Sequence, residues 1–227
     1  MYVCKKSKKM TQIKACIFDM DGVLVSTEVY HFKAWQRLAQ TVGIEIDEVF
    51  NENLKGVSRA VCIDLILEHG GIHKSQAEKD ELATQKNVWF LEYIQHISPR
   101  DVFPGVLSFI QNLRAQGYSL AIGSASKNAP LLLQKMEIAH YFDAVIDGNK
   151  ITKAKPNPEV FLRAAQELHV ESKACVVFED ALSGVQAAKS AGMYCIGVGS
   201  PLHLTLADEC ITSFTEMSVD RIRSIQF

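Results

Sequence analysis

The sequence predicts an α/β protein in which a parallel sheet is covered by helices and carries a small helical insertion. A short unbroken apolar run, Ala15–Phe18, indicates a strand that is buried on both faces. From residue 105 to residue 198, helix-like and strand-like segments alternate, which is typical of a parallel sheet with helices on both sides. The intervening residues 27–98 show helical periodicity and no convincing strand, so they are expected to form the insertion.

Charge and composition argue against several broad classes of function. A formal net charge of −2 gives no reason to expect a nucleic-acid partner, and no apolar run is long enough to span a bilayer. The cysteines form no C-x-x-C pair, and Cys16, Cys175 and Cys195 lie in strand-like segments. Reduced, buried thiols are therefore expected. We predict a cytoplasmic monomer that has no nucleic-acid or membrane partner.

The first 12 residues contain a cluster of lysines but no apolar segment of the kind found in a secretory signal. We interpret residues 1–12 as a solvated, disordered tail, in preference to a nucleic-acid-binding arm. Met10 directly precedes the first strand, so the functional chain could begin there.

Three or four helices are expected in the insertion. One begins after Thr27 and ends near Gly43, one spans residues 58–69, and one spans residues 75–96. The apolar positions expected to face the core are Val29, Phe32, Trp35, Leu38 and Ala39 in the first of these helices, and Ala77, Leu82, Val88, Leu91 and Ile94 in the last.

The remainder of the chain is expected to build the sheet and its covering helices. Helices are predicted at residues 105–116, 128–136, 158–169 and 182–191, and strands at residues 118–122, 144–146, 174–178 and 194–198. A further strand near residues 210–212 and a helix at residues 217–225 would end the chain.

Polar motifs fall where these strands end. Ligands of open α/β sheets bind outside the carboxyl ends of the strands, so residues far apart in sequence can converge there. The motifs are Asp19 and Asp21 after the first strand, Ser124 after the second, Lys155 in a loop entering a helix, and Glu179 with Asp180 after the strand CVVF.

Two acids one residue apart can divide the chemistry of phosphoryl transfer. One carboxylate can accept a phosphoryl group as a nucleophile, and the other can handle a proton. The alternative for Asp19 and Asp21 is a strand that ends in an Asx turn. Glu179 and Asp180 can hold Mg²⁺ together with Asp19, because this ion prefers carboxylate oxygens. Their alternative role is to complement the dipole at the start of a helix.

Two further residues fit an anion site. Ser124 can offer a hydroxyl and a backbone N–H to a phosphate, or it can simply cap a helix. Lys155 can neutralise a transferring phosphoryl group, although a lysine before a proline is often only a surface residue.

Four motifs resemble the signature motifs of the haloacid dehalogenase (HAD) superfamily and occur in the same order: DxDGVLxxT, the serine, the Lys-Pro pair and the Glu-Asp pair. The resemblance extends from Ile13 to about Ser200. The resemblance implies a Rossmann-like core with a helical cap inserted after the first strand. The core would comprise residues 13–26 and 99–227, and the cap would comprise residues 27–98.

Segments of the expected cap, together with one core loop, resemble those of the beta-phosphoglucomutases. These segments are YHFKAW from Tyr30, FNE and LKGVSR in residues 50–59, Lys86-Asn87, and SASKN from Ser124. The resemblance implies an isomerase of carbohydrate metabolism that interconverts beta-D-glucose 1-phosphate and glucose 6-phosphate with Mg²⁺. The reaction would pass through an aspartyl phosphate and beta-glucose 1,6-bisphosphate. A sugar-phosphate phosphatase on the same scaffold, or a non-catalytic sugar-phosphate sensor, remains an alternative.

The same resemblance assigns roles to individual residues. Asp19 matches the nucleophile and Asp21 the general acid/base, and both match metal ligands together with Glu179 and Asp180. Arg59 matches the residue that grips the non-transferring phosphate. The expected phosphate and substrate contacts are Thr27, His31, Trp35, Gly56, Val57, Ser58, Arg59, Lys86, Ser124, Ala125, Ser126, Lys127 and Lys155.

The chain departs from the usual pattern of this group at a few positions. Ser26 stands where an aspartate is common, and Cys62 stands where these mutases tend to carry serine. Residues 181–184 read Ala-Leu-Ser-Gly, whereas Ser-Gln-Ala-Gly is more usual. None of these changes removes a catalytic group.

Overall fold

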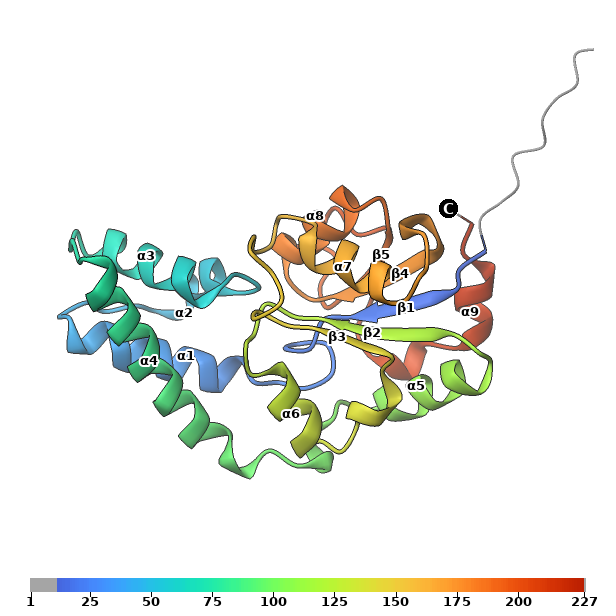
Figure 1. The fold of residues 1–227 in the computed structure, drawn as a ribbon, viewed down its shortest axis with the longest axis horizontal. Coiled ribbons are helices and arrows are strands. Elements are labelled where there is room, and N and C mark those ends of the chain that lie inside the picture. The colour runs from blue at the N-terminus through green and yellow to red at the C-terminus, as the bar shows by residue number, and fades with distance from the viewer. Residues whose placement is uncertain (1–11, 227) are drawn as a thin grey trace, which may run out of the picture.

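The computed structural model describes residues 12–226, which form a two-lobed α/β molecule (Figure 1). Most of the predicted tail, and the alternative start at Met10, lie outside the described residues. The larger lobe is a parallel six-stranded sheet with the strand order β3-β2-β1-β4-β5-β6. Its strands are β1 (Ala15–Phe18), β2 (Ser119–Gly123), β3 (Ala144–Ile146), β4 (Cys175–Glu179), β5 (Tyr194–Val198) and β6 (Glu209–Ile211).

Apart from α2, the α-helices of the described chain agree with the predicted segments within a few residues at each end. They are α1 (Glu28–Thr41), α2 (Glu48–Asn51), α3 (Arg59–His69), α4 (Gln76–Tyr93), α5 (Val106–Ala115), α6 (Ala129–Lys135), α7 (Glu159–Glu167), α8 (Leu182–Ser190) and α9 (Val219–Ser224). The α/β class and the parallel sheet are thereby confirmed. The short helix α2 has no counterpart among the three helical segments whose bounds the sequence predicted.

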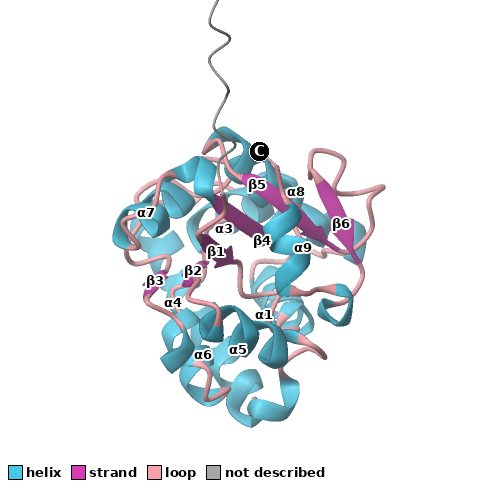
Figure 2. Ribbon diagram, turned by 90° about the vertical axis from the view of Figure 1, so that its right-hand side faces the viewer, coloured by secondary structure: helices cyan, strands magenta, loops and turns pink. Residues whose placement is uncertain are grey.

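Strand β1 lies at the centre of the sheet, between β2 and β4. Successive side chains of a strand point to opposite faces, so Cys16 and Phe18 pack with the helices α5, α6 and α9, while Ala15 and Ile17 pack with α7 and α8. The ring of Phe18 stacks on Phe178 of β4, with 4.8 Å between centroids. Figure 2 views this sandwich from the end opposite the smaller lobe.

The smaller lobe consists of α1 to α4 and lies beyond the carboxyl ends of the strands (Figure 1). Side chains cap the start of α2, α3 and α4, where they accept hydrogen bonds from backbone N–H groups that have no partner within the helix. The Ser58 hydroxyl accepts from the Val61 N–H at the start of α3, and Ser75 forms a capping box with Glu78 at the start of α4. These local signals explain why the predicted helix starts lie within one residue of those observed.

The prediction of the buried faces in the first and last cap helices is correct only in part: Trp35, Leu38, Ala39 and Ile94 are buried as expected. Val29 and Val88, which were expected to face the core, are 55% and 45% exposed. Helix α4 also buries Lys86, Trp89 and Phe90. Apolar spacing alone missed Lys86, because a lysine that packs against aromatic rings is an arrangement that hydrophobicity does not predict.

Two connecting segments lead into and out of the smaller lobe side by side. Val25 and Val102 form an antiparallel bridge, and the Phe103 N–H donates to the Leu24 carbonyl over 2.9 Å. The division of the chain at residues 26 and 99 remains a prediction. None of the helices in the described part of the chain is both long and apolar enough to cross a membrane.

Candidate active site

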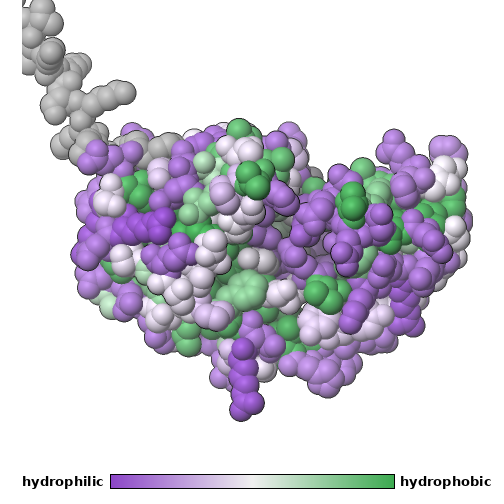
Figure 3. All heavy atoms as spheres, turned by 180° about the vertical axis from the view of Figure 1, so that it is seen from behind, coloured by the Kyte–Doolittle hydropathy of each residue, from purple (hydrophilic) through white to green (hydrophobic). Residues whose placement is uncertain are grey.

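A cavity of about 380 Å³ lies between the two lobes. Seen from behind, the surface is hollowed where the lobes meet, and hydrophilic residues border the hollow (Figure 3). The predicted site residues that line the cavity are Asp19, Asp21, His31, Trp35, Gly56, Val57, Ser58, Arg59, Lys86, Ser124, Ala125, Ser126 and Lys127. Thr27, Lys155, Glu179 and Asp180 do not line it but lie beside the carboxylates that do, as described below.

The core end of the cavity contains a buried ion triad. The Lys155 ammonium donates to Asp19 Oδ1 over 2.6 Å and to Glu179 Oε2 over 2.8 Å. Burial alone would lower the pKa of Lys155, but the adjacent charges of Asp19 and Glu179 hold it above its usual range. Lys155 is therefore a permanent cation directly behind the carboxylate that faces the cavity.

Asp19, Glu179 and Asp180 are arranged as a cation site would require. Each offers a carboxylate oxygen, and these oxygens lie within 4.8 Å of one another. Two glycines make room for the cluster. A Cβ on Gly22, whose φ is +81°, would lie 2.0 Å from Asp180 Oδ2, and a Cβ on Gly184 would lie equally close to the Glu179 carboxylate. Oxygen ligands of this kind fit a hard divalent cation.

Asp21 follows Asp19 at the cavity wall and has a different environment. Its carboxylate accepts a hydrogen bond from the hydroxyl of Thr27, which is fully buried. Burial, reinforced by the charge of Asp19, raises the pKa of Asp21 to about 7. A carboxyl group that titrates near neutrality can both give and take a proton, as a general acid/base must.

A buried lysine joins the smaller lobe to this carboxyl group. The Lys86 Nζ lies 2.8 Å from Nδ1 of His31 and 4.2 Å from the centre of the Trp35 ring. Burial lowers the pKa of Lys86 to about 7 and holds that of His31 well below its usual value. When Lys86 donates to Nδ1, the neutral imidazole carries its proton on Nε2, which lies 3.9 Å from Asp21 Oδ2.

Arg59 lies at the first position of α3, and the guanidinium Nη2 donates to Asn87 Oδ1 over 2.8 Å. Asn87 belongs to α4 and also accepts a hydrogen bond of 2.9 Å from Asn128 of the larger lobe. Burial lowers the pKa of Arg59, although a guanidinium group stays charged throughout the physiological range. Asp19 and Arg59 therefore line the same cavity, one from each lobe.

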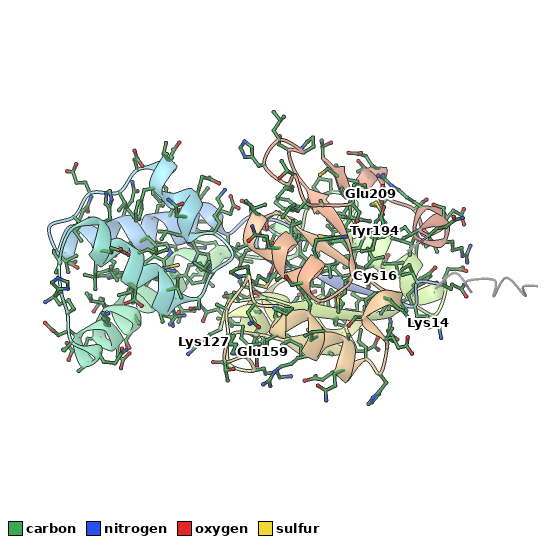
Figure 4. All side chains as sticks on the ribbon, turned by 90° about the horizontal axis from the view of Figure 1, so that it is seen from above. Lys14, Cys16, Lys127, Glu159, Tyr194 and Glu209 are labelled. Carbon is green, nitrogen blue, oxygen red and sulfur yellow. The ribbon has the colours of Figure 1, made fainter. Side chains whose placement is uncertain are left out.

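The loop after β2 forms another part of the wall. Ser124 is buried, and its hydroxyl accepts from the Ser126 N–H over 3.1 Å. The Asn128 N–H in turn donates to the Ser126 hydroxyl, just before α6 begins. Lys127 is exposed, and it lies at the end of the core that faces the smaller lobe, whereas Lys14 lies at the opposite end (Figure 4).

Several residues of the site were missed by the sequence analysis. Cavity-lining residues without a predicted role include Asn51, Lys55, Cys62, Asp80, Ile151 and Thr152. Asn87 and Asn128 stand within the segments that carry the family resemblance, so that resemblance was the available signal for them.

The fold and this constellation of carboxylates and lysine define an enzyme of the HAD class. A family profile described as haloacid dehalogenase-like hydrolase matches residues 13–192, and the chain belongs to this family. Beta-phosphoglucomutase of Bacillus subtilis is 37% identical over 210 residues, which cover 92% of this chain and 93% of the relative.

Two other comparisons mark the range of related proteins. A crystal structure of beta-phosphoglucomutase from Clostridium difficile aligns with a TM-score of 0.90 and 38% identity, and covers 93% of this chain and 96% of that chain. Phosphorylated carbohydrates phosphatase of Thermotoga maritima is 32% identical over 184 residues, with 80% of this chain and 82% of the relative covered. The relatives thus include both a mutase and a phosphatase.

Proposed function

We propose that this protein is a phosphosugar mutase that interconverts beta-D-glucose 1-phosphate and glucose 6-phosphate. The observation that carries the proposal is that one cavity has Asp19 on its core side and Arg59 on its cap side. A phosphatase needs a grip only on the phosphate that it removes. A mutase also has to hold the second phosphate of a bisphosphate intermediate, and a guanidinium fork is well suited to that contact.

In the proposed reaction, Asp19 starts as an aspartyl phosphate. Asp21 takes the proton of the sugar 6-hydroxyl, whose oxygen attacks the phosphorus while the bond to the Asp19 oxygen breaks. The product is beta-glucose 1,6-bisphosphate. After the bisphosphate has turned round, the Asp19 oxygen attacks the 1-phosphoryl group and Asp21 returns the proton to the leaving sugar oxygen. Glucose 6-phosphate is released and the aspartyl phosphate is restored.

Other residues of the site support these steps electrostatically. Lys155 would neutralise charge on the transferring group, with Ser124 donating to one of its oxygens. The residues that would hold Mg²⁺ are Asp19, Glu179, Asp180 and the backbone carbonyl of Asp21. The chemistry that a bound Mg²⁺ supplies is further neutralisation of phosphoryl charge.

A sugar-phosphate phosphatase is the second candidate, and the similarity to the Thermotoga maritima phosphatase favours it. In that reaction, water would take the phosphoryl group from Asp19. A mutase must keep water away from the aspartyl phosphate, and a cap that closes over the bound sugar phosphate would do so.

The decisive experiment is a coupled assay with Mg²⁺ and beta-glucose 1-phosphate. Glucose 6-phosphate formation is measured with and without the bisphosphate primer, and free phosphate is measured in the same samples. Primer-dependent formation of glucose 6-phosphate that exceeds phosphate release supports the mutase. Stoichiometric phosphate release would assign the protein as a phosphatase, and no turnover of either kind would favour a sensor.

A further inference from the structure

Asn87 connects the two lobes at the cavity. Its side-chain oxygen accepts a hydrogen bond of 2.8 Å from the Arg59 guanidinium and one of 2.9 Å from the Asn128 amide. Arg59 begins α3 and Asn87 lies on α4, so both belong to the smaller lobe, whereas Asn128 directly precedes α6 of the larger lobe. The side-chain oxygen of Asn87 thus accepts hydrogen bonds both from Arg59 of the smaller lobe and from Asn128 of the larger lobe.

The chemistry of the three groups determines which atoms face one another. A guanidinium group has only donors, so the Asn87 atom beside it must be the carbonyl oxygen. Asn128 must then donate through its amide nitrogen. Because both partners depend on the same acceptor, the orientation of Asn87 is set by Arg59 and Asn128 together.

A second contact between the lobes does not involve Arg59. The Ser183 hydroxyl of α8 donates to the Lys55 carbonyl over 3.4 Å. The two lobes are especially close there, because a Cβ on Gly56 would lie 2.6 Å from the Ser183 oxygen. This contact holds the lobes together without touching the arginine, so it provides a comparison for Asn87.

We propose that Asn87 is a positioning residue that presents Arg59 to the cavity only when the smaller lobe is closed on the larger one. The hydrogen bond from Asn128 exists only with the lobes together. It fixes the Asn87 oxygen, which in turn holds one N–H of Arg59 and leaves the other N–H groups for a phosphate. Closure of the two lobes therefore completes the contact between Arg59 and the phosphate that is not being transferred. A bisphosphate is held while the lobes are closed and released when they open.

The expected effect on mutase flux rests on the proposed function, whereas the expected effect on the contact between the lobes does not. In Asn87→Ala, mutase flux should fall roughly tenfold or more, as expected when a hydrogen bond to a charged group is lost. Formation of the aspartyl phosphate from acetyl phosphate should stay within about twofold, because this small donor does not reach Arg59. Asn128→Ala should lower mutase flux as well, and Asn87→Ala/Asn128→Ala should be no worse than Asn87→Ala alone.

Three further variants separate positioning from general closure and from helix stability. Ser183→Ala weakens the contact between Ser183 and Lys55 and should change mutase flux less than about threefold, since its hydrogen bond is neutral and long. Gln85→Ala changes an exposed residue of the same helix and should have no effect. Asn87→Asp keeps an acceptor but adds a negative charge beside Arg59, so KM for the bisphosphate should rise although the hydrogen bonds survive.

Amide hydrogen exchange of the free enzyme gives a readout that needs no turnover. Exchange in residues 124–128 should speed up in Asn87→Ala and stay slow in Asn87→Asp. Unchanged exchange in Asn87→Ala, or equal losses of mutase flux and aspartyl phosphate formation, would overturn the inference. A wild-type enzyme that forms no glucose 6-phosphate would instead refute the proposed function, while the exchange data would still decide whether Asn87 joins the lobes.

Discussion

Lys155 donates a hydrogen bond of 2.6 Å to Asp19, although the two residues lie 136 positions apart in the chain. Asp19 follows β1, and Lys155 lies in the loop between β3 and α7. The contact is buried, and Lys155 also pairs with Glu179. Because these charges are removed from water, each of them is stable in the folded protein only while it remains paired.

Lys155→Met should therefore destabilise the protein markedly in the absence of Mg²⁺. Removing the cation leaves Asp19 and Glu179 unpaired, and breaking a buried ion pair typically costs about 3–5 kcal/mol. Urea unfolding measures the change, and Lys173→Met, at an exposed lysine paired with Glu171, is the control. Mg²⁺ should restore part of the loss in Lys155→Met. A variant as stable as the wild type would contradict the ion-triad account.

Asp19→Asn should abolish both mutase and phosphatase turnover. An amide cannot accept the phosphoryl group, and it is also a weaker ligand for a divalent cation. Both activities are measured in the coupled assay, with Asp64→Asn as the control because Asp64 pairs with Lys79 on the outside of the smaller lobe. Activity above a small fraction of the wild-type value, with contamination excluded, would show that another group is the nucleophile.

Asp21→Asn should slow phosphoryl transfer to and from sugar hydroxyls by about 10²–10⁴-fold, the usual contribution of general acid–base catalysis. Single-turnover kinetics with the sugar phosphate measures this step directly. Folding of the variant is checked by circular dichroism. An unchanged single-turnover rate would remove Asp21 from the proton transfer.

The raised pKa of Asp21 also predicts a pH dependence of stability. The folded state keeps this proton up to about pH 7, whereas the unfolded state loses it near pH 3.8. The folded state therefore binds more protons between these values, so the stability contributed by Asp21 falls as the pH rises through this window. Without Mg²⁺, wild type should lose stability relative to Asp21→Asn from pH 4 to pH 7. A constant difference would contradict the raised pKa.

The stability difference between wild type and Lys86→Met should change with pH in the opposite direction, and over a higher range of pH. Because the pKa of Lys86 is lowered to about 7 from 10.5, the unfolded state binds more protons between these values. Wild type should therefore gain stability relative to Lys86→Met as the pH rises from 7 to 10. Urea unfolding across this range measures the difference. Methionine keeps the contact with Trp35 and Phe90, so lost packing should not obscure it.

Arg59→Ala should separate the mutase from the phosphatase. Loss of a charged contact worth about 1.5–3 kcal/mol, together with weaker closure, should lower mutase flux by roughly a hundredfold or more. Hydrolysis of the aspartyl phosphate should decline much less, so the ratio of hydrolysis to mutase flux should rise. Both fluxes are measured in wild type and variant.

Arg37→Ala provides the matched control for this experiment. Arg37 lies on α1 of the same lobe and stacks over Trp89 at 4.4 Å, away from the residues that line the cavity. Its removal should leave the flux ratio unchanged. If Arg59→Ala lowers both fluxes in equal proportion, or leaves mutase flux unaffected, Arg59 does not grip the distal phosphate and the case for a mutase loses its main support.

Local patterns in the sequence were enough to predict the sheet, the covering helices and the start of the long cap helix. A short apolar run such as Ala15–Phe18, followed at once by turn residues, favours a buried strand, and the capping box of Ser75 and Glu78 satisfies backbone N–H groups at the start of α4 locally. The predicted polar motifs also lie at one end of the sheet, because parallel strands all end at the same edge.

Only the tertiary structure determined which charged and polar side chains are buried together, away from water. The spacing of apolar residues in α4 could not indicate that Lys86 is buried, because its burial depends on the rings of Trp35 and Phe90 and on the nitrogen of His31. Nor could it show that Asn87 joins Arg59 to Asn128. Such contacts form between elements that are remote in sequence, and the dielectric environment of each charge is a property of the assembled fold.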